Sequence, residues 1–381
     1  MPFDVILTAN YSPWSKYSGG AQKSVHMVAV ELARQGLRVA VVGSRTPWEK
    51  VAVPEGLPYS MHWAWFFALK PGISSPLRFL NGISFFFKVR SLSSPVTVLH
   101  GNGDEASLLW LIRAKRKFVY TNRYPEFPAY MRGLKWSRPW TWLRVLFREP
   151  RFAAIALALR HADRVTVTSA YSRTEVAGIF GVDLDEGAVV YNGIDPVFLD
   201  SPERPGNDRK GILFYGRLTR SKGSDLLLEA YALLPEGLRA GHPLAFLGAG
   251  PLRESLETRA GELGVGVAFG GWKQGADLVR EIQARKLVCL PSREESFGNT
   301  VAETLALGQA LVTTTVGSIP EVAGPFGTRI PGMTPRDLAA SLEAELARDR
   351  DAEEVRRQRE FIRSRYSWSK AAERFRESYG N

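Results

Sequence analysis

Short runs of apolar residues alternate with helical patterns along most of the chain. The first run covers residues 3–9, and it is followed over 21–36 by a segment whose apolar residues recur every three or four positions. Continuous apolar runs bounded by turn residues are typical of strands buried on both faces. Their regular alternation with helices predicts an α/β protein built from parallel sheets.

The alternation is interrupted at residues 199–210, which are rich in proline, glycine and charge, and a second strand–helix series follows. A chain of 381 residues is also too long for one ordinary hydrophobic core. We therefore predict two doubly wound domains, 1–198 and 211–360, joined by a linker at 199–210. In such sheets ligands bind outside the carboxyl ends of the strands, so we expect a cleft between the two domains. A charged helical pattern covers 361–381.

The composition is that of a soluble globular protein, with 45% hydrophobic and 23% charged residues. The one cysteine, Cys289, has no partner for an intrachain disulfide, which favours a reducing compartment. The first residues lack the basic and apolar regions of a signal peptide, and no apolar run approaches the ~20 residues that span a bilayer. We therefore expect a cytoplasmic protein.

The net charge of +11 is concentrated in one part of the chain. Residues 61–160 hold sixteen Lys and Arg but four Asp and Glu, together with six of the ten tryptophans. Basic residues interleaved with tryptophan are typical of proteins that bind an anionic membrane surface or nucleic acid. The charge by itself does not decide between these two partners.

Residues 137–150 predict an amphipathic helix inside this basic region. Trp140, Leu143 and Phe147 recur at helical spacing and form one apolar face. Such a helix lies in a bilayer interface, with the cations of residues 113–150 toward anionic headgroups, or else its apolar face packs on the core of the first domain.

Two carboxylates flank a glycine turn in the second domain. Glu295 lies in a loop after an apolar strand, and Glu303 lies in a helix that we expect to begin near Asn299. Gly298 allows the backbone to approach a ligand closely, and Asn299 is a good N-cap residue. The first N–H groups of that helix would form a seat for phosphate oxygens. The alternative is a solvated acidic loop.

Two further strand-to-helix turns of the second domain carry residues that suit a diphosphate. The segment 215–227 contains Arg217 and Lys222, a guanidinium fork and a point charge, beside a glycine. The segment 246–256 contains Gly250 before Pro251. Either turn, taken singly, is also compatible with a plain surface loop or with a glycine needed for packing.

The first domain has two candidate positions. Gly19 and Gly20 lie between the first strand and the first helix, where a double glycine lets the backbone contact a ligand or simply forms a loop. His100 ends an apolar strand at its carboxyl edge. A single histidine is more often structural than functional, although the strand end favours a role in a site.

Taken in this order, the features resemble the retaining, nucleotide-sugar-dependent glycosyltransferases of the GT-B fold, in the large family numbered four. The resemblance covers nearly the whole chain, and the two glutamates with Phe297-Gly298 between them are its most specific part. It implies two Rossmann-like domains, the first binding the acceptor and the second the nucleotide sugar, and a helix at 361–381 that crosses back onto the first domain. Ser318 departs from the family pattern, which often has a second glycine there.

The resemblance also implies a role for each matching residue. Arg217 and Lys222 would hold the donor diphosphate, while Glu303 would bind the ribose and Glu295 the donor sugar. The catalytic residues implied are Glu295, Arg217, Lys222 and His100, the last contacting the sugar from the first domain. The donor-binding residues implied are Gly19, Gly20, Arg217, Lys222, Gly250, Pro251, Leu252, Phe297, Gly298, Asn299, Thr300 and Glu303.

The function implied is transfer of a hexose from a UDP or GDP sugar, with retained anomeric configuration and without metal or cofactor. Cationic side chains and helix amides would offset the phosphate charge. We expect a glycan or lipid-linked acceptor of cell-surface polysaccharide or lipopolysaccharide synthesis, at the inner face of the membrane. The alternative is a soluble small-molecule acceptor. Nucleic acid is not an expected partner, because the chain carries no nucleic-acid-binding signature.

Overall fold

The structure is a computed structural model, and it describes residues 2–15, 19–45, 49–65, 79–123, 131, 135, 137–148, 150–203 and 209–380, without the side chains of residues 79, 142, 144 and 146–148. The chain forms two compact units, which comprise Met1–Gly193 with Trp368–Asn381 (unit 1) and Ile194–Ser367 (unit 2). These divisions differ from the predicted boundaries at 198 and 361. Residues 204–208 of the predicted linker lie outside the described ranges.

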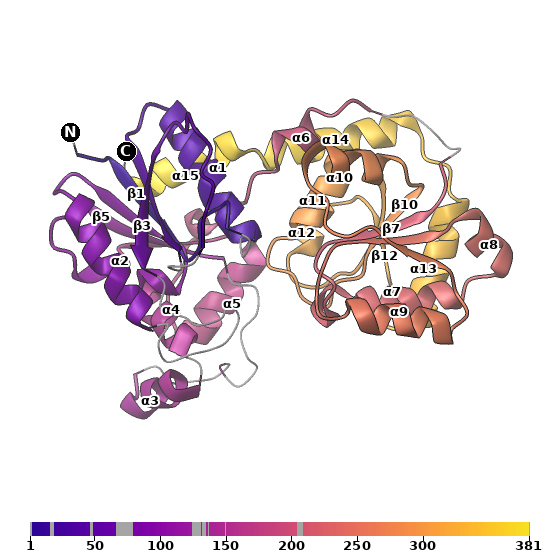
Figure 1. Ribbon diagram of the computed structural model, residues 1–381, viewed down its shortest axis with the longest axis horizontal. Helices are drawn as coiled ribbons and strands as arrows, with labels where there is room; N and C mark the ends of the chain where they lie inside the picture. The colour runs from indigo at the N-terminus through magenta and orange to yellow at the C-terminus, as the bar shows by residue number, and fades with distance from the viewer. Residues whose placement is uncertain are drawn as a thin grey trace. The chain divides into compact units, whose positions relative to one another are not determined.

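Unit 1 is built on a six-stranded parallel sheet of order β3-β2-β1-β4-β5-β6 (Figure 1). Its strands are β1 (Val5–Ala9), β2 (Val39–Arg45), β3 (Ser60–Trp65), β4 (Val98–Gly101), β5 (Lys117–Asn122) and β6 (Arg164–Val167). Its helices are α1 (Gly20–Arg34), α2 (Phe79–Leu92), α3 (Pro139–Arg148), α4 (Pro150–His161), α5 (Ala170–Phe180) and α15 (Trp368–Tyr379), with 3₁₀ turns at Asp104–Ala106, Leu109–Leu111 and Glu186–Ala188.

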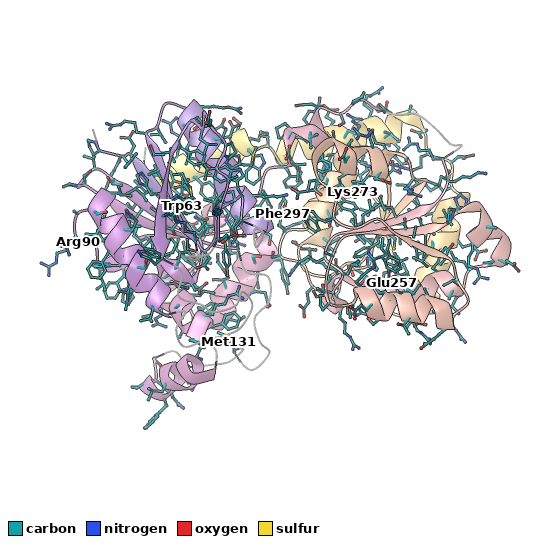
Figure 2. The ribbon with its side chains drawn as sticks, viewed as in Figure 1. Trp63, Arg90, Met131, Glu257, Lys273 and Phe297 are labelled. Atoms are coloured by element: carbon teal, nitrogen blue, oxygen red, sulfur yellow. The ribbon has the colours of Figure 1, made fainter. Side chains whose placement is uncertain are left out.

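Alternate residues of this sheet face two separate cores, as the period of a strand requires. Val5 and Leu7 of β1 pack with buried residues of α1 and α15. Ile6 faces the opposite side, where it packs with buried residues of α2, α4 and α5. Helix α15 therefore covers the sheet of unit 1, although it lies at the other end of the sequence. Charged side chains such as Arg90 of α2 extend into solvent (Figure 2).

Unit 2 has a second six-stranded parallel sheet, of order β12-β11-β10-β7-β8-β9. Its strands are β7 (Ile212–Tyr215), β8 (Leu244–Leu247), β9 (Val267–Phe269), β10 (Leu287–Leu290), β11 (Ala310–Thr313) and β12 (Thr328–Arg329). Its helices are α6 (Pro196–Leu199), α7 (Ser224–Ala232), α8 (Glu236–Gly241), α9 (Arg253–Glu262), α10 (Gly275–Gln283), α11 (Asn299–Ala306), α12 (Ile319–Ala323), α13 (Pro335–Ala347) and α14 (Ala352–Arg365), with a 3₁₀ turn at Arg220–Lys222.

In both sheets the strand order reverses beside the first strand. In unit 1 the reversal lies between β1 and β4, and in unit 2 it lies between β7 and β10. In open parallel sheets ligands bind outside the carboxyl ends of the strands at such a reversal. The prediction of two doubly wound α/β sheets is thus confirmed, and the topology points to the loops after β7 and β10.

Helix α3 is the predicted amphipathic helix. Trp140 and Leu143 are 79% and 43% exposed, whereas Thr141 and Val145 on the other face are buried. These two apolar side chains therefore do not pack on the core; the side chain of Phe147 lies outside the described residues. No helix in the described ranges has the length and apolar character needed to cross a membrane.

The basic segment 113–117 and α3 lie at opposite ends of α4. His161 at the C-terminal end of α4 stacks on Trp110, with ring centroids 4.0 Å apart. At the other end, α4 begins at Pro150, directly after α3 ends at Arg148. Since α4 has 12 residues, it separates the two by about 18 Å. The cations of residues 113–117 therefore lie about one helix length from α3.

Candidate functional site

Three loops meet at the carboxyl edge of the unit 2 sheet, because β8, β7 and β10 are neighbours in it. The loop after β7 contacts the loop after β10 through Gly223, where a Cβ atom would lie 2.0 Å from the carbonyl oxygen of Pro291. Gly223 also has φ of +73°, which only glycine adopts readily. This position therefore requires glycine, and it fixes Lys222 beside the second loop.

An arginine that sequence reasoning missed joins the same two loops. Arg293 Nη1 and Nη2 donate to the carboxylate of Asp225 at 2.7 and 3.1 Å, and Nη1 also donates to the carbonyl oxygen of Arg220 at 2.6 Å. A two-pronged guanidinium–carboxylate pair fixes orientation as well as distance. The sequence gives no signal for this pair, because Asp225 and Arg293 belong to different strand-to-helix turns.

The structure brings Lys222 and Glu295 together. Lys222 Nζ donates to Glu295 Oε2 at 2.6 Å, and the two side chains are 21% and 9% exposed. Ser318 stabilises the loop that carries Glu295, since the Ser318 N–H donates to the carbonyl oxygen of Glu295 at 3.2 Å. Sequence reasoning assigned these two groups to different parts of one ligand, whereas here they form one half-buried ion pair.

Two helices begin at this edge without a side-chain cap. The N-cap residues of α7 and α11 are Gly223 and Gly298, and neither helix has a side-chain hydrogen bond at its N-cap. We expected Asn299 to cap α11, but it is the first helical residue and Gly298 is the cap. The partial positive charge of both helix N-termini is thus available to an anion at the β7–β10 reversal.

Glu303 lies on α11 beside a buried tyrosine. The Tyr215 hydroxyl, at the end of β7, donates to the carbonyl oxygen of Thr300 at 2.6 Å and lies 3.0 Å from Thr304 Oγ1. Burial raises the pKa of Tyr215 well above its usual value, and the nearby Glu303 carboxylate raises it further. Glu303 is half-buried one to two turns into the helix, and Tyr215 joins that helix to the central strand.

The glycine turn after β8 serves packing at Gly250. A Cβ atom there would lie 2.4 Å from the carbonyl oxygen of Leu218, so the two loops meet backbone to backbone. Pro251 is exposed and Leu252 is half-buried, so both are reachable from solvent. Arg217 is exposed, and its side chain makes no ion pair with any described residue.

The side chain of Phe297 is not exposed to a ligand. It is 2% exposed, and its ring meets that of Tyr366 edge to face, with centroids 5.5 Å apart. Only the backbone of Phe297 is therefore left for the donor-binding role that we expected. Gly19 and Gly20 of unit 1 lie at the start of α1, where Gly19 is the N-cap and both residues are exposed.

His100 is a structural residue, contrary to our expectation that it contacts a sugar. It is fully buried, with Nδ1 2.7 Å from the Tyr379 hydroxyl of α15 and Nε2 2.6 Å from Thr121 Oγ1. Burial, helped by the positive charge of Arg123, lowers the pKa of His100 to about 3, so the ring is neutral. Both ring nitrogens are occupied in tying α15 to the sheet.

The carboxyl edge of the unit 1 sheet carries buried polar side chains that sequence reasoning did not identify. Glu105 accepts a hydrogen bond from Thr8 Oγ1 at 2.9 Å, and Asp104 accepts one from Asn10 Nδ2 at 2.5 Å. Burial, with the charge of Asp104, raises the pKa of Glu105 to about 7. Arg123 follows β5 at the same edge.

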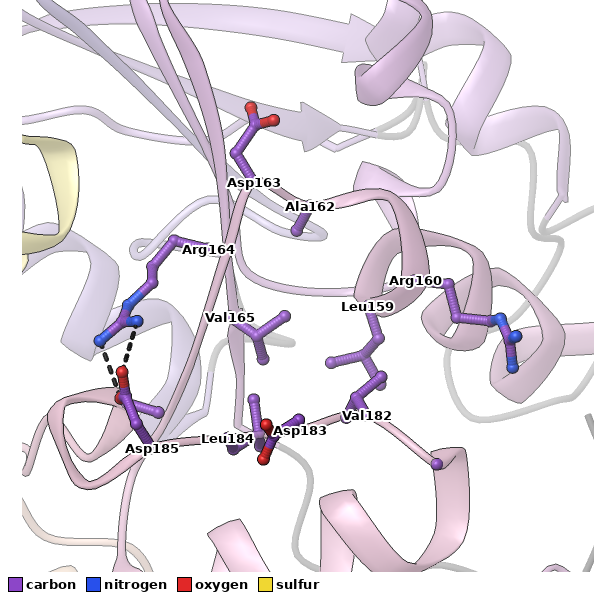
Figure 3. Close-up of a pocket in the computed structure, with 12 residues that line it drawn as sticks. Leu159, Arg160, Ala162, Asp163, Arg164, Val165, Val182, Asp183, Leu184 and Asp185 are labelled. Carbon is purple, nitrogen blue, oxygen red and sulfur yellow. Dashed lines mark hydrogen bonds and ion pairs between the residues drawn. The ribbon is translucent and has the colours of Figure 1, made fainter.

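A hollow of about 420 Å³ lies elsewhere in unit 1, at the start of β6 (Figure 3). Arg164 closes one side by donating to both oxygens of Asp185, at 2.8 and 2.9 Å. Asp163 accepts from the N–H of Phe118 at 2.6 Å. Arg164 and Asp185 therefore neutralise each other, and the hollow lies at the amino end of its strand, away from the edge where ligands bind.

The described residues contain no group of three or more His, Cys, Asp or Glu side chains that could hold a metal ion. Asp-x-Asp is a pattern that can bind a metal ion, and the chain has two such triplets, at 183–185 and 349–351. Asp185 is paired with Arg164, and Asp351 accepts from the N–H of Glu354 as the N-cap of α14.

Comparisons with known families match both units of the chain. The family described as Glycosyltransferase Family 4 matches residues 18–198, and the family described as Glycosyl transferases group 1 matches residues 199–363. The chain belongs to glycosyltransferase family 4. Within this family 4 chain, the first match covers residues 18–193 of unit 1 and the first five residues of unit 2, and the second match covers most of unit 2.

Curated relatives match part of this family 4 member. It is 33% identical over 180 residues to an uncharacterised glycosyltransferase of Methanocaldococcus jannaschii, which is 44% of this chain and 46% of the relative. It is 31% identical over 201 residues to a D-inositol 3-phosphate glycosyltransferase of a Mycobacterium species, 49% and 45% of the two chains. The matches span about half the length of these relatives.

Solved structures share the fold over the whole chain. Sucrose-phosphate synthase of Thermosynechococcus elongatus superposes with a TM-score of 0.77 at 19% identity, covering 99% of this chain and 98% of that one. HepE of Anabaena, in complex with UDP and glucose, gives a TM-score of 0.71 at 18% identity over 100% of both chains. At these identities the likeness shows the GT-B fold.

Proposed function

We propose that this family 4 member is a retaining glycosyltransferase that transfers a hexose from a nucleotide-diphosphate sugar. The proposal rests on the β7–β10 reversal of unit 2. Lys222, Arg217 and two uncapped helix N-termini lie there, together with Glu295 and Glu303. In the reaction the bond between the anomeric carbon and the diphosphate oxygen breaks, the acceptor hydroxyl oxygen forms a new bond to that carbon, and the hydroxyl proton passes to the leaving diphosphate. The negative charge develops on the leaving diphosphate.

The residues of the reversal suit that change in charge. Arg217 is exposed and unpaired among the described residues, and Lys222 is held in place by Glu295. Preorganised cations and helix N–H groups stabilise a developing oxyanion without reorganising during the reaction. HepE was solved with UDP and with UDP-glucose, which supports a nucleotide-sugar donor here. This charge compensation needs no metal ion, and we propose a metal-independent reaction.

Glu303 and Glu295 have separate roles in the proposal. Glu303, one to two turns into α11, binds the ribose, while Glu295 contacts the sugar and orients Lys222. Glu303→Ala should therefore weaken binding of the nucleotide and of the donor alike. Calorimetric titration of the free nucleotide diphosphate tests this role, and an unchanged affinity in Glu303→Ala would contradict it.

The acceptor is proposed to be a glycan or a lipid-linked saccharide of cell-surface polysaccharide synthesis, used at the inner face of the membrane. Trp140 and Leu143, exposed on α3 near the exposed Lys135 and Arg138, support attachment to an anionic bilayer surface. A soluble phosphorylated acceptor is the second candidate. The names of two relatives, D-inositol 3-phosphate glycosyltransferase and sucrose-phosphate synthase, favour it.

A donor panel tests the proposed function directly. The full chain is incubated with UDP- and GDP-sugars, and mass spectrometry follows release of the nucleotide diphosphate with and without EDTA. We expect turnover of one donor class, unaffected by the chelator and lost in Arg217→Ala. Proton NMR of the product should show the anomeric configuration of the donor. An inverted product or abolition by EDTA would contradict the retaining, metal-independent reaction.

A further inference from the structure

A buried arginine at the carboxyl edge of the unit 1 sheet has no part in the site described above. Arg123 directly follows β5 and is 9% exposed. Burial lowers its pKa to about 10, against the opposing effect of Tyr379, so the side chain keeps its charge at neutral pH. Burying a cation is unfavourable unless an anion compensates it.

The described residues provide neutral partners for this cation and no carboxylate. Arg123 Nε donates to Asn102 Oδ1 at 3.0 Å, and Nη1 donates to Asn192 Oδ1 at 2.7 Å. Its Nη2 is buried and makes no hydrogen bond. The two acids that follow β4 are not its partners, since Asp104 accepts from Asn10 and Glu105 accepts from Thr8 through Oε1.

The two asparagines fix the orientation of the guanidinium plane. A fixed fork with unused N–H donors is preorganised for the oxygens of a phosphate or a carboxylate. The position agrees with a ligand site, because Asn102 and Arg123 follow adjacent strands at the edge where doubly wound sheets bind ligands. Thr168, which follows β6 as Arg123 follows β5, also has a buried hydroxyl without a partner.

We propose that Arg123 binds an oxyanion of the acceptor substrate, so that the acceptor carries a phosphate or a carboxylate near the hydroxyl that is glycosylated. The proposal rests on the proposed function, because it takes unit 1 as the acceptor side. It deepens that function by naming the chemical class of the acceptor. The donor is the other source of such an oxyanion, and the experiment separates the two sources.

Calorimetric titration of the full chain with inorganic phosphate and with glucose 6-phosphate, against neutral glucose, tests the proposal. The titrations use an Arg217→Ala/Lys222→Ala background, in which unit 2 no longer offers its proposed phosphate site. We expect Arg123→Gln to weaken binding of both phosphates at least tenfold. The matched control, Arg90→Gln on the exposed face of α2 (Figure 2), should change it less than twofold. Glucose should not bind measurably.

Arg123→Lys covers the case in which Arg123→Gln fails to fold. It keeps the charge but loses the fork, so phosphate binding should weaken several-fold while thermal unfolding stays close to that of the parent. Equal phosphate binding in the parent and either folded Arg123 variant would overturn the proposal, as would phosphate binding that disappears on replacing Arg217 and Lys222. Binding of the donor nucleotide to Arg123→Gln is measured in parallel. If Arg123→Gln binds the donor nucleotide with normal affinity and binds phosphate as tightly as the parent, the inference about the acceptor is wrong and the proposed function is unaffected.

Discussion

The ion pair between Lys222 and Glu295 changes how mutations at this edge must be interpreted. Each group was expected to contact a different part of the donor, yet their side chains lie 2.6 Å apart. Removing either one leaves the other partly buried without its partner, which is unfavourable in itself. The loss of activity in a single variant therefore combines a lost ligand contact with a displaced neighbour.

A double-mutant cycle separates the two effects. Lys222→Ala should lower turnover by ~10²–10³, as is typical for loss of transition-state charge stabilisation. Glu295→Gln should lower it less, and the double variant should be far less impaired than the product of the two, because contacting residues are not additive. Single-turnover rates with saturating donor give the three values. Strictly multiplicative losses would show that the ion pair has no functional coupling.

His100 was expected to contact the donor sugar, but its ring connects α15 to the sheet through hydrogen bonds. His100→Ala should lower the free energy of unfolding by about 2–4 kcal/mol, from a cavity and two lost buried hydrogen bonds. Donor turnover per folded molecule should change less than tenfold. Urea unfolding and initial rates measure the two quantities. A loss of turnover with normal stability would restore the catalytic role.

The same histidine predicts a pH dependence of stability. The folded pKa of about 3 lies below the ordinary value of 6.5, so between these limits the unfolded chain binds a proton that the folded chain does not. The contribution of His100 to stability is therefore full above pH 6.5 and decreases toward pH 3, by about 1.4 kcal/mol per pH unit. Urea unfolding at several pH values gives the free energy of unfolding at each pH. This free energy should decrease less steeply from pH 6.5 toward pH 3 in the His100→Ala variant than in the parent.

At the scale of elements, the strands and helices could be predicted because their signals are local. Continuous apolar runs gave β1, β4 and β10, and helical periodicity gave α1. The contacts between elements could not be predicted in this way. His100 and Tyr379 are 279 positions apart, and Arg293 and Asp225 are 68 apart, so no pattern along the chain connects them. Lys222 and Glu295 were identified singly, whereas their pairing depends on the adjacency of β7 and β10.

Helix α3 provides a test at the element scale. Trp140→Ser with Leu143→Ser removes the exposed apolar face without touching the buried Thr141 and Val145. If α3 inserts in a bilayer interface, sedimentation with liposomes that contain phosphatidylserine should fall at least tenfold in this variant. A matched pair of substitutions on the exposed face of α2, Ile83→Ser with Phe87→Ser, serves as the control. Equal sedimentation with neutral liposomes, or none at all, would favour the soluble acceptor.

At the scale of the molecule, the chain has two units, each built on its own parallel sheet. Each unit has its own strand reversal and its own polar edge, so ligand binding to one edge need not order the other.

Hydrogen exchange reports this division, because binding protects the backbone amides that a ligand contacts or stabilises. With the matching nucleotide diphosphate, we expect slower exchange in peptides that cover residues 216–224 and 291–303 of unit 2. The strands β1, β4 and β5 of unit 1 should exchange as before. In Lys222→Ala the protection of both loops should disappear at the same nucleotide concentration. Protection confined to residues 98–123 would instead place the nucleotide on unit 1 and reverse the assignment of donor and acceptor.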